Sequence, residues 1–323
     1  MKASVYRQYG GPEVVCIKEV PMPVARKGEV LVRVVATTVS SADWRVRSLE
    51  LPKGFGPMGR LMFGIAGPRK QVLGTEFSGI VEGAGGGGFQ PGDAVIGFPG
   101  GALGAHAEYI AIKPDRLVAK PDGMDFAQAA AVCFGGTTAY DFLVNKAGLS
   151  AGQRVLINGA SGAVGLAAVQ LARHLGAEVT GVCSARNADL ARDLGAVEVI
   201  DYAAEDVRAR VAAFDMVVDM VGNLSVADAS AMLVRGGKVV KIAGGLVDLV
   251  FGAVIARLKG RRAVTGVASE AQAVIQKAVD LAASGAVMPV IGRRYGFADM
   301  VAAHAQVDSG RKLGSVVVDI SQP

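Results

Sequence analysis

Residues 156–187 read LINGASGAVGLAAVQLARHLGAEVTGVCSARN, and this stretch decides the fold. The apolar residues before Gly159 predict a buried strand, and the apolar spacing after Gly165 predicts a helix. A glycine-rich turn between a strand and a helix lets the backbone approach a pyrophosphate, which the helix N-terminus then holds. Because the strand and the helix are both present, the motif predicts a dinucleotide site. The loop residues expected to bind are Gly159, Ala160, Ser161, Gly162, Ala163 and Val164.

Strands and helices alternate along the chain after residue 124, which is typical of a parallel sheet with crossover helices. Before residue 124 the pattern is different, because short β-branched runs are separated by Gly and Pro turns. The tail after residue 268 does not extend the parallel sheet. We therefore expect an α/β protein with a nucleotide-binding domain over 124–268. A β-rich, barrel-like domain is expected over 1–123 and 269–323.

The end of the second strand of the nucleotide-binding domain indicates which dinucleotide binds. In NAD sites an acidic residue at this position binds the ribose 2′-hydroxyl. Here the strand ends in Ser184, Arg186 and Asn187, and the first acid is Asp189, inside the following helix. A serine hydroxyl and a guanidinium suit a 2′-phosphate, so the sequence favours NADPH. The alternative is that Arg186 is a surface charge and Asn187 only a helix cap.

Composition excludes several function classes. The net charge is +5 with the basic residues dispersed, so we expect no nucleic-acid partner. The three cysteines are far apart, which favours a reducing compartment and gives no metal-ligand spacing. The longest apolar run, 246–258, is too short to span a bilayer. We expect a cytoplasmic protein with no membrane partner.

A hydrolase is a competing interpretation of the glycine-rich turn. Gly159 and Ser161 fit the start of a Gly-x-Ser-x-Gly nucleophile elbow, but Ala163 stands where the second glycine belongs. A hydrolase would also need a histidine, and His304 lies in a helical pattern.

Taken together, several further motifs resemble the medium-chain dehydrogenase/reductase superfamily, and within it the zinc-independent quinone oxidoreductase-like branch. The matching segments run along nearly the whole chain: LGTEFSGIVEGAG (73–85), PGDAVIGF, GAHAEYIAI, GGTTAYDFL, GQRVLINGASGAVG, GVCSARN, LGAVEVIDY, RGGKVV and GRKLGSVVV. The resemblance implies a GroES-like catalytic domain, a Rossmann domain with a doubly wound parallel sheet, and NADPH as the hydride donor.

The resemblance also implies site residues. Candidate catalytic residues are Asp43, Trp44 and Thr75. Asp43 is expected either to relay a proton or to cap a turn, and Trp44 either to line the substrate site or to pack in the core. Further cofactor contacts, from the family match or from strand ends at the cofactor edge, are expected at Ser41, Thr138, Tyr202, Val221, Ala243, Gly244, Gly314 and Ser315.

The zinc site of the superfamily's alcohol dehydrogenases is not matched. Thr75 stands where they have a ligand histidine, and their two ligand cysteines fall near Ser40 or Ser41 and near Phe134. We therefore expect no metal. Glu76, beside Thr75, is expected to pair with a neighbouring arginine.

Without a metal, the acceptors that are easiest to reduce are those that spread the negative charge themselves: quinones, enals and enones. The sequence thus predicts a zinc-independent oxidoreductase that transfers hydride from NADPH to a small hydrophobic acceptor of this kind.

Segment 48–70 is expected to be a mobile loop around the substrate, and 246–258 a cover over the cleft or a dimer contact. The strand near 262–269 is a candidate edge for a homodimer. An NADPH-binding protein with little catalysis and a zinc-free ketone or alcohol dehydrogenase remain alternatives.

Overall fold

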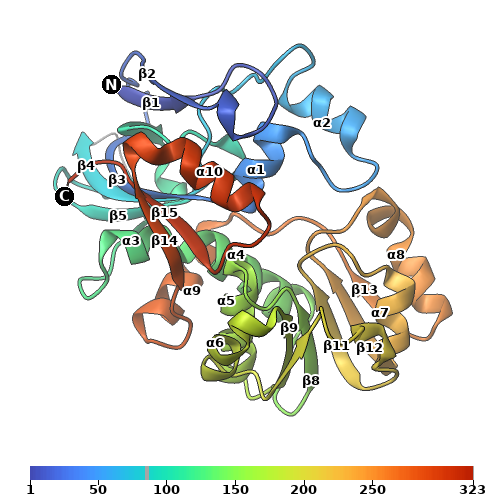
Figure 1. Ribbon diagram of the computed structural model, residues 1–323. Coiled ribbons are helices and arrows are strands. Elements are labelled where there is room, and N and C mark those ends of the chain that lie inside the picture. Colours follow the sequence, from blue (N-terminus) through green and yellow to red (C-terminus); the bar gives the residue numbers. More distant parts are fainter. Residues whose placement is uncertain (84–86, 323) are drawn as a thin grey trace.

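The computed structural model describes residues 1–83 and 87–322, and it contains two large sheets (Figure 1). The end of the matching segment 73–85 therefore lies outside the described residues. Both chain termini lie beside the first sheet, and the green-to-orange middle of the chain forms the second. Within the described ranges, no helix is both long enough and apolar enough to cross a membrane.

The second sheet is the parallel sheet that the glycine motif predicts. Its six strands run in the order β10-β9-β8-β11-β12-β13, and each neighbouring pair is parallel. The strands are β8 (Arg154–Asn158), β9 (Glu178–Cys183), β10 (Glu198–Asp201), β11 (Phe214–Asp219), β12 (Leu233–Lys241) and β13 (Arg262–Val264).

Side chains alternate between the two faces of this sheet, and each face has its own core. Val155 and Ile157 of β8 pack with the helix α5, whereas Leu156 packs with α7 and α8 on the opposite face. Helices cover both faces, as the prediction of a doubly wound sheet requires. They are α4 (Val132–Tyr140), α5 (Ala163–His174), α6 (Ala188–Asp193), α7 (Val226–Met232) and α8 (Leu246–Leu258).

The first sheet has seven strands in the order β14-β15-β3-β4-β5-β7, with β6 paired to β3. The tail of the chain returns to this sheet, since Val316 of β15 pairs with Val39 of β3. Its strands are β3 (Val30–Val39), β4 (Phe77–Gly83), β5 (Ala94–Gly97), β6 (Tyr109–Ile112), β7 (Leu117–Ala119), β14 (Ile291–Gly296) and β15 (Ser315–Asp319). A separate ribbon pairs β1 (Lys2–Val5) with β2 (Cys16–Glu19). The α/β fold class is confirmed, whereas the division of the chain at residues 123/124 and 268/269 stays a proposal.

Two helices interrupt the β-rich part of the chain, where the sequence predicts strands and a loop. α1 (Ser41–Ser48) begins at a capping box, in which Ser40 and Asp43 exchange hydrogen bonds. α2 (Gly56–Phe63) begins with Pro57 in its first turn and has regular structure inside the predicted loop 48–70. The prediction of a purely β-type unit is therefore wrong for these two segments. Both helices are short, and α2 also contains two glycines and a proline, which hides the helical pattern.

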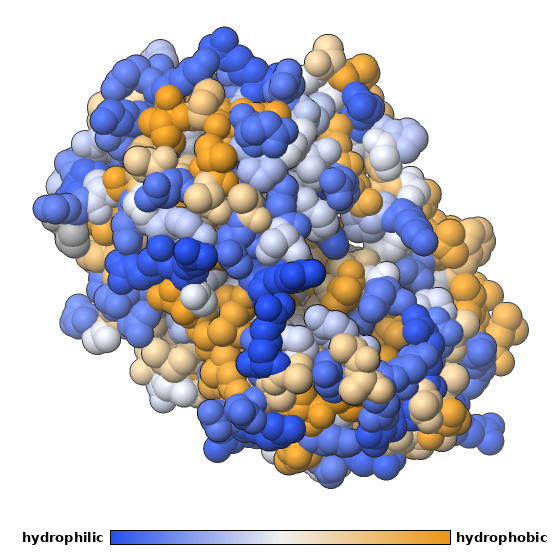
Figure 2. Space-filling view, viewed as in Figure 1, coloured by the Kyte–Doolittle hydropathy of each residue, from blue (hydrophilic) through white to orange (hydrophobic). Residues whose placement is uncertain are grey.

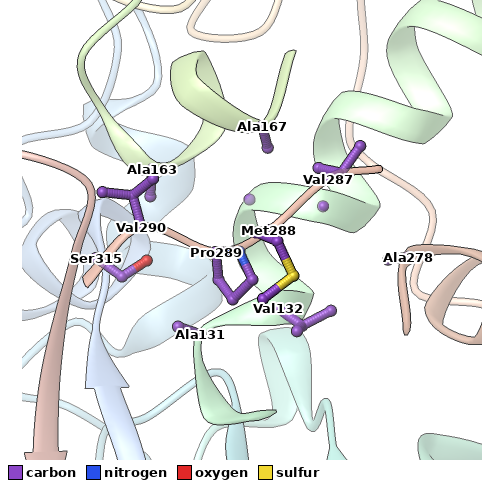
Figure 3. A pocket seen from close by; sticks show the side chains of 12 residues that line it. Ala131, Val132, Ala163, Ala167, Ala278, Val287, Met288, Pro289, Val290 and Ser315 are labelled. Carbon is purple, nitrogen blue, oxygen red and sulfur yellow. The ribbon is translucent and has the colours of Figure 1, made fainter. Parts of the chain in front are cut away.

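The remaining helices are α3 (Phe126–Ala130), α9 (Gln272–Ala283) and α10 (Met300–Asp308), and a π-helix (Asp141–Lys146) follows α4. Of these, α3 and α9 contact both α4 and strands of the first sheet, whereas α10 packs on the first sheet. The junction is tightly packed, because α4 presents Gly135 to the backbone of α5 and Gly136 to Ala278 of α9. Figure 3 shows the small cavity left there, with Met288, Pro289 and Val290 along one wall. Its volume of about 10 Å³ is too small for a ligand, so the functional site lies elsewhere.

Candidate functional site

The large cleft of the molecule lies where the parallel strands end. It has a volume of about 520 Å³ and extends over the carboxyl ends of β8, β9, β11 and β12, the edge at which sheets of this type bind ligands. The opposite wall comes from the other sheet's unit, through α1, the end of α10 and the loop 309–312. Of the predicted site residues, these line the cleft: Ser41, Trp44, Gly159, Ser161, Gly162, Ala163, Val164, Ser184, Arg186, Asn187, Tyr202, Val221 and Ala243.

The glycine loop at the centre of the cleft leaves space that no larger residue would leave. Gly159 has a φ of +89°, and a Cβ on it would lie 2.9 Å from Val221. A Cβ on Gly165 would lie 2.1 Å from the Gly159 carbonyl oxygen, so α5 packs directly on the turn. Gly162 is the N-cap of α5 and supplies no capping side chain. The first amides of α5 are thus free to bind an anion, and the loop fits a pyrophosphate.

The far end of the cleft carries the residues predicted to select NADPH. Ser184 directly precedes the short 3-10 helix Ala185–Asn187, and its hydroxyl lines the cleft with Arg186. Asn187 stands at the N-cap position of α6, but its side chain makes no capping hydrogen bond. Among the described residues no acidic side chain pairs with Arg186, since Asp189 pairs with Arg192 instead. This set fits the 2′-phosphate of NADPH.

A buried ion pair fixes the strand ends at the other side of the cleft. Lys241 Nζ lies 2.6 Å from Asp219 Oδ2, and both side chains are almost fully buried. The Asp219 carboxylate also accepts hydrogen bonds from the backbone amides of Val221, Gly222 and Leu224. The pair therefore shapes the turn after β11. The sequence analysis missed it, although an aspartate and a lysine that each end an apolar strand were a usable signal.

The position of the absent zinc site holds a network of hydroxyl groups and a carboxylate. Ser40 Oγ lies 3.3 Å from Thr75 Oγ1 and donates to Asp43 Oδ2 at 2.6 Å. Asp43 Oδ1 accepts the Gly74 amide at 2.8 Å, and the side chain of Asp43 is fully buried. This geometry favours the capping role of Asp43, and its catalytic role stays a prediction. Two hydroxyls without a thiolate or imidazole do not fit a tetrahedral zinc.

Glu76 lies behind this network and pairs with no arginine of residues 1–83 and 87–322, so the predicted Glu76–Arg pair is wrong. Its carboxylate accepts from Thr38 Oγ1 at 2.5 Å and from the Phe134 amide at 2.6 Å. Because burial outweighs these bonds, the pKa of Glu76 rises to about 7. Lys312 lies on the cleft wall. Burial lowers its pKa to about 8, although the charges of Glu76 and Asp43 act to raise it.

Several predicted residues do not line the cleft itself. Gly244 lies in a neighbouring cavity, Ser315 borders the small junction cavity, and Gly314 contacts the glycine loop through its amide, 2.9 Å from the Ser161 carbonyl. Thr75, Thr138 and Ala160 are buried. Trp44 is partly buried and both lines the cleft and packs on the core, so the two alternatives are not exclusive. The contacts assigned to these residues stay predictions.

A second, apolar cavity adjoins the cleft. It has a volume of about 280 Å³ and shares Ile242 with the cleft. Its walls come from segment 51–63, which includes α2, and from α8 and the loop 265–267. That segment 48–70 surrounds the substrate stays a prediction. The side chains that line it are mostly large and apolar: Leu51, Phe55, Met58, Met62, Phe63, Leu249 and Val267.

Metal ligands are sparse throughout the described part of the chain, where no three His, Cys, Asp or Glu side chains gather in a group that could hold a metal ion. Cys133 is buried next to the former ligand position, and burial raises its pKa well above the ordinary value of a thiol. A neutral thiol in this environment is a core residue.

Comparison with known proteins agrees with this site. The family of the alcohol dehydrogenase GroES-like domain matches residues 26–122, and the zinc-binding dehydrogenase family matches residues 194–318. A 2-methylene-furan-3-one reductase of Solanum lycopersicum is 31% identical over 98% of this chain and 79% of its own length. A quinone oxidoreductase of Pseudomonas aeruginosa is 32% identical over 98% of this chain and 99% of its own.

A solved structure of a quinone oxidoreductase is also similar to this chain. The Escherichia coli quinone oxidoreductase complexed with NADPH is 27% identical, has a TM-score of 0.84, and covers 99% of this chain and 100% of its own. The match to a zinc-binding dehydrogenase family covers residues 194–318. It therefore includes none of the positions at which the resemblance places the zinc ligands, near Ser40 or Ser41, at Thr75 and near Phe134. The chain belongs to the medium-chain dehydrogenase/reductase superfamily, in its zinc-independent quinone oxidoreductase-like branch.

Proposed function

We propose that this oxidoreductase uses NADPH to reduce quinones, enals or enones without a metal ion. The observation that carries the proposal is the combination of an intact dinucleotide cleft with a former metal position filled by Ser40 and Thr75. A quinone oxidoreductase whose structure is complexed with NADPH, a further quinone oxidoreductase and a 2-methylene-furan-3-one reductase are among the similar proteins and support the same conclusion.

The cleft residues supply positioning and selectivity for the cofactor. The glycine loop and the first amides of α5 would hold the pyrophosphate, and Ser184 and Arg186 the 2′-phosphate. Bound there, NADPH supplies a hydride to the acceptor. A conjugated acceptor spreads the resulting negative charge over its own atoms, so no metal is needed to stabilise it. The protein then has to orient the acceptor and exclude water.

We place the acceptor in the apolar cavity beside the cleft. Its lining favours a small hydrophobic molecule, because burying apolar surface drives binding and the cavity offers few polar groups. Lys241 borders the cavity, but its ammonium is already held by Asp219 and by the Leu224 carbonyl. The cavity therefore has no free charge that would select an acidic substrate.

A deuterium-transfer experiment tests this function. An enone is incubated with the protein and NADPH that carries deuterium on the transferred position of the nicotinamide. We expect a saturated ketone with deuterium on the carbon β to the carbonyl, and no reduction of that ketone itself. Deuterium on the carbonyl carbon would instead identify a ketone or alcohol dehydrogenase. Tight NADPH binding without any product would identify a binding protein with little catalysis.

We further propose a homodimer in the cytoplasm. The support for the dimer is that β13, only three residues long, is the edge of the parallel sheet and offers unpaired backbone groups. Replacing Val264 by proline removes the backbone N–H of this residue from β13. If β13 pairs across a two-fold axis, light scattering after size exclusion will show a shift from dimer to monomer.

A further inference from the structure

Four basic side chains among the described residues line the cleft, and only one of them can release a proton near neutral pH. Arg45, Arg186 and Arg311 carry guanidinium groups, which stay charged. The fourth is Lys312, on the wall of the cleft that faces the glycine loop. Figure 2 shows hydrophilic residues in the middle of the view, where the loop after α10 meets the second sheet.

The position of Lys312 is fixed relative to the glycine loop. Its ammonium donates to the Gly314 carbonyl at 3.2 Å. The Gly314 amide in turn donates to the Ser161 carbonyl at 2.9 Å, and Gly162 and Gly314 form a short parallel bridge. The segment that carries the lysine is therefore attached to the turn that fits a pyrophosphate.

Lys312 has no counter-ion, although it lies close to two carboxylates. The charges of Glu76 and Asp43, at and behind the former metal position, both act on its ammonium. Both carboxylates already accept hydrogen bonds from other groups. In residues 1–83 and 87–322, no acidic side chain forms an ion pair with Lys312. Burying an ammonium without a counter-ion is costly, which is typical of a group that serves a ligand or a reaction.

The other titratable side chains of the cleft are paired or lie at its far end. Asp308 pairs with Arg47. Cys183 ends β9 and Tyr202 follows β10, at the end of the cleft that is predicted to hold the 2′-phosphate. Lys312 is therefore the acid of the cleft that lies beside the former metal position.

We propose that Lys312 is a catalytic acid, which donates a proton to the oxygen of the reduced acceptor in place of the charge that a metal would supply. This inference rests on the proposed function. When the carbon β to the carbonyl of an enone accepts hydride, the negative charge moves to the carbonyl oxygen and an enolate forms. An N–H bond of Lys312 then breaks and its proton forms an O–H bond. The resulting enol tautomerises to the saturated ketone, and the lysine regains a proton from water.

The same step completes the reduction of a quinone, because the proton converts the hydroquinone anion into the hydroquinone. Burial suits the lysine to this role. It lowers the pKa of Lys312 from 10.5 to about 8, although the charges of Glu76 and Asp43 act to raise it. The ammonium is thus still protonated at neutral pH, and it gives up its proton more readily than an exposed lysine does. Three further charged side chains, from α1, α10 and the following loop, line the same cleft: Arg45, Asp308 and Arg311.

Two substitutions separate proton donation from positive charge. Lys312→Met removes both, whereas Lys312→Arg keeps the charge but releases no proton near neutral pH. We expect kcat for an enone and for a quinone to fall about 100-fold in both variants. The Kd of NADPH, measured by fluorescence titration, should stay unchanged, which also shows that both variants fold. Lys277→Met, at an exposed position of α9, is the matched control and should keep the unaltered rate.

The pH dependence gives a second readout. In the unaltered protein, kcat should decrease above a pH of about 8, where the ammonium loses its proton. This decrease should be absent from the residual activity of both variants. Glu76→Gln removes a negative charge that raises the pKa of Lys312, so it should move the decrease to lower pH. Competitive labelling of the lysines with acetic anhydride, followed by mass spectrometry of the peptide that contains Lys312, measures the same pKa without turnover.

The outcomes distinguish this proposal from the proposed function. Turnover of a conjugated acceptor by the unaltered protein, with the same kcat in Lys312→Met or a full recovery in Lys312→Arg, would reject the role of the lysine alone. A raised Kd of NADPH with an unchanged kcat would also overturn it, because Lys312 would then be a ligand of the cofactor. An unaltered protein that reduces no conjugated acceptor would reject the proposed function and the role of Lys312 together.

Discussion

Arg186 is the residue on which the choice of cofactor depends. It lines the cleft with Ser184, and its guanidinium has no acidic partner among the described residues. Replacing it by glutamine removes a charge-assisted hydrogen bond to the 2′-phosphate. We expect the Kd of NADPH to rise about 10- to 100-fold and that of NADH to stay unchanged, as measured by fluorescence titration.

Arg192 provides the control for this prediction. It is a nearby surface arginine that already pairs with Asp189 at 2.8 Å. Arg192→Gln should leave both dissociation constants unchanged. Equal weakening of NADPH and NADH in the Arg186 variant would show that the residue supports the loop and does not select the phosphate.

Glu76 gives the stability of the protein a defined dependence on pH. Burial raises the pKa of Glu76 from an ordinary value of 4.5 to about 7. Between pH 4.5 and pH 7 this carboxyl is therefore mostly protonated in the folded state and mostly ionised in the unfolded state. This carboxyl therefore costs increasing stability as pH rises from 4.5 to 7, by up to about 3 kcal/mol. Relative to Glu76→Gln, the free energy of unfolding of the unaltered protein should fall by this amount across that window.

Denaturant titrations at several pH values measure this difference. The Thr38 hydroxyl donates to Glu76 and lowers its pKa, so Thr38→Val should extend the window to higher pH. A difference between the unaltered protein and Glu76→Gln that is constant from pH 4.5 to 7 would contradict the account.

At the residue scale, the sequence predicts contacts between residues that are close in sequence better than contacts between residues that are far apart in sequence. The spacing of the glycines after β8 and the absence of an acid after β9 are local features, and the residues that they single out line the cleft. The partners of Glu76 come from β3 and α4, which are far from it in sequence. No local pattern identifies Thr38 and the Phe134 amide as the groups that replace an arginine.

At the scale of elements, α5 and the turn before it form one unit. A methyl group on Gly165 would lie 2.1 Å from the Gly159 carbonyl oxygen, so Gly165→Ala must push the helix away from the sheet. We expect a loss of about 1–3 kcal/mol in the free energy of unfolding and weaker NADPH binding. Gly123→Ala is the matched control, because nothing lies within 4 Å of its Cβ position. Unchanged stability and affinity in Gly165→Ala would show that the turn is not tightly packed.

The ends of β11 and β12 depend on the Asp219–Lys241 pair. Lys241→Met leaves the buried Asp219 carboxylate without its counter-charge, and we expect a loss of about 3–5 kcal/mol in thermal or denaturant unfolding. Adding Asp219→Asn removes that uncompensated charge and should recover part of the loss. A double variant that is as unstable as the sum of the two single variants would show that the groups do not interact.

Elements differ in how well the sequence predicts them. α5 has a long regular pattern and is found where the sequence places it, whereas the apolar run 246–258 forms the helix α8, which the sequence analysis did not predict as a helix. α1 and α2 each span eight residues, and α2 contains two glycines and a proline. Their helical form depends on a capping box in one case and on packing against Leu51 in the other. In each segment, the turn-like composition is a stronger sequence signal than the feature that favours a helix.

At the scale of the whole molecule, the return of the tail is the feature that joins the two sheets. The sequence indicates that 269–323 does not extend the parallel sheet, and β15 pairs with β3 across nearly the whole chain. This arrangement determines where the cleft lies, because the end of α10 and the loop 309–312 form its outer wall. The adjoining apolar cavity could not be predicted in the same way, since it depends on how α2 and α8 face each other.

The central claim is that NADPH-dependent reduction proceeds here without a metal. The most direct measurement is the rate of NADPH oxidation by chelator-treated protein with a quinone, an enone and a saturated ketone, and with NADH in parallel. The account predicts turnover of the quinone or the enone, a preference for NADPH over NADH, and no turnover of the saturated ketone. Activity that disappears on chelation and returns with zinc, or that is confined to the saturated ketone, would contradict it.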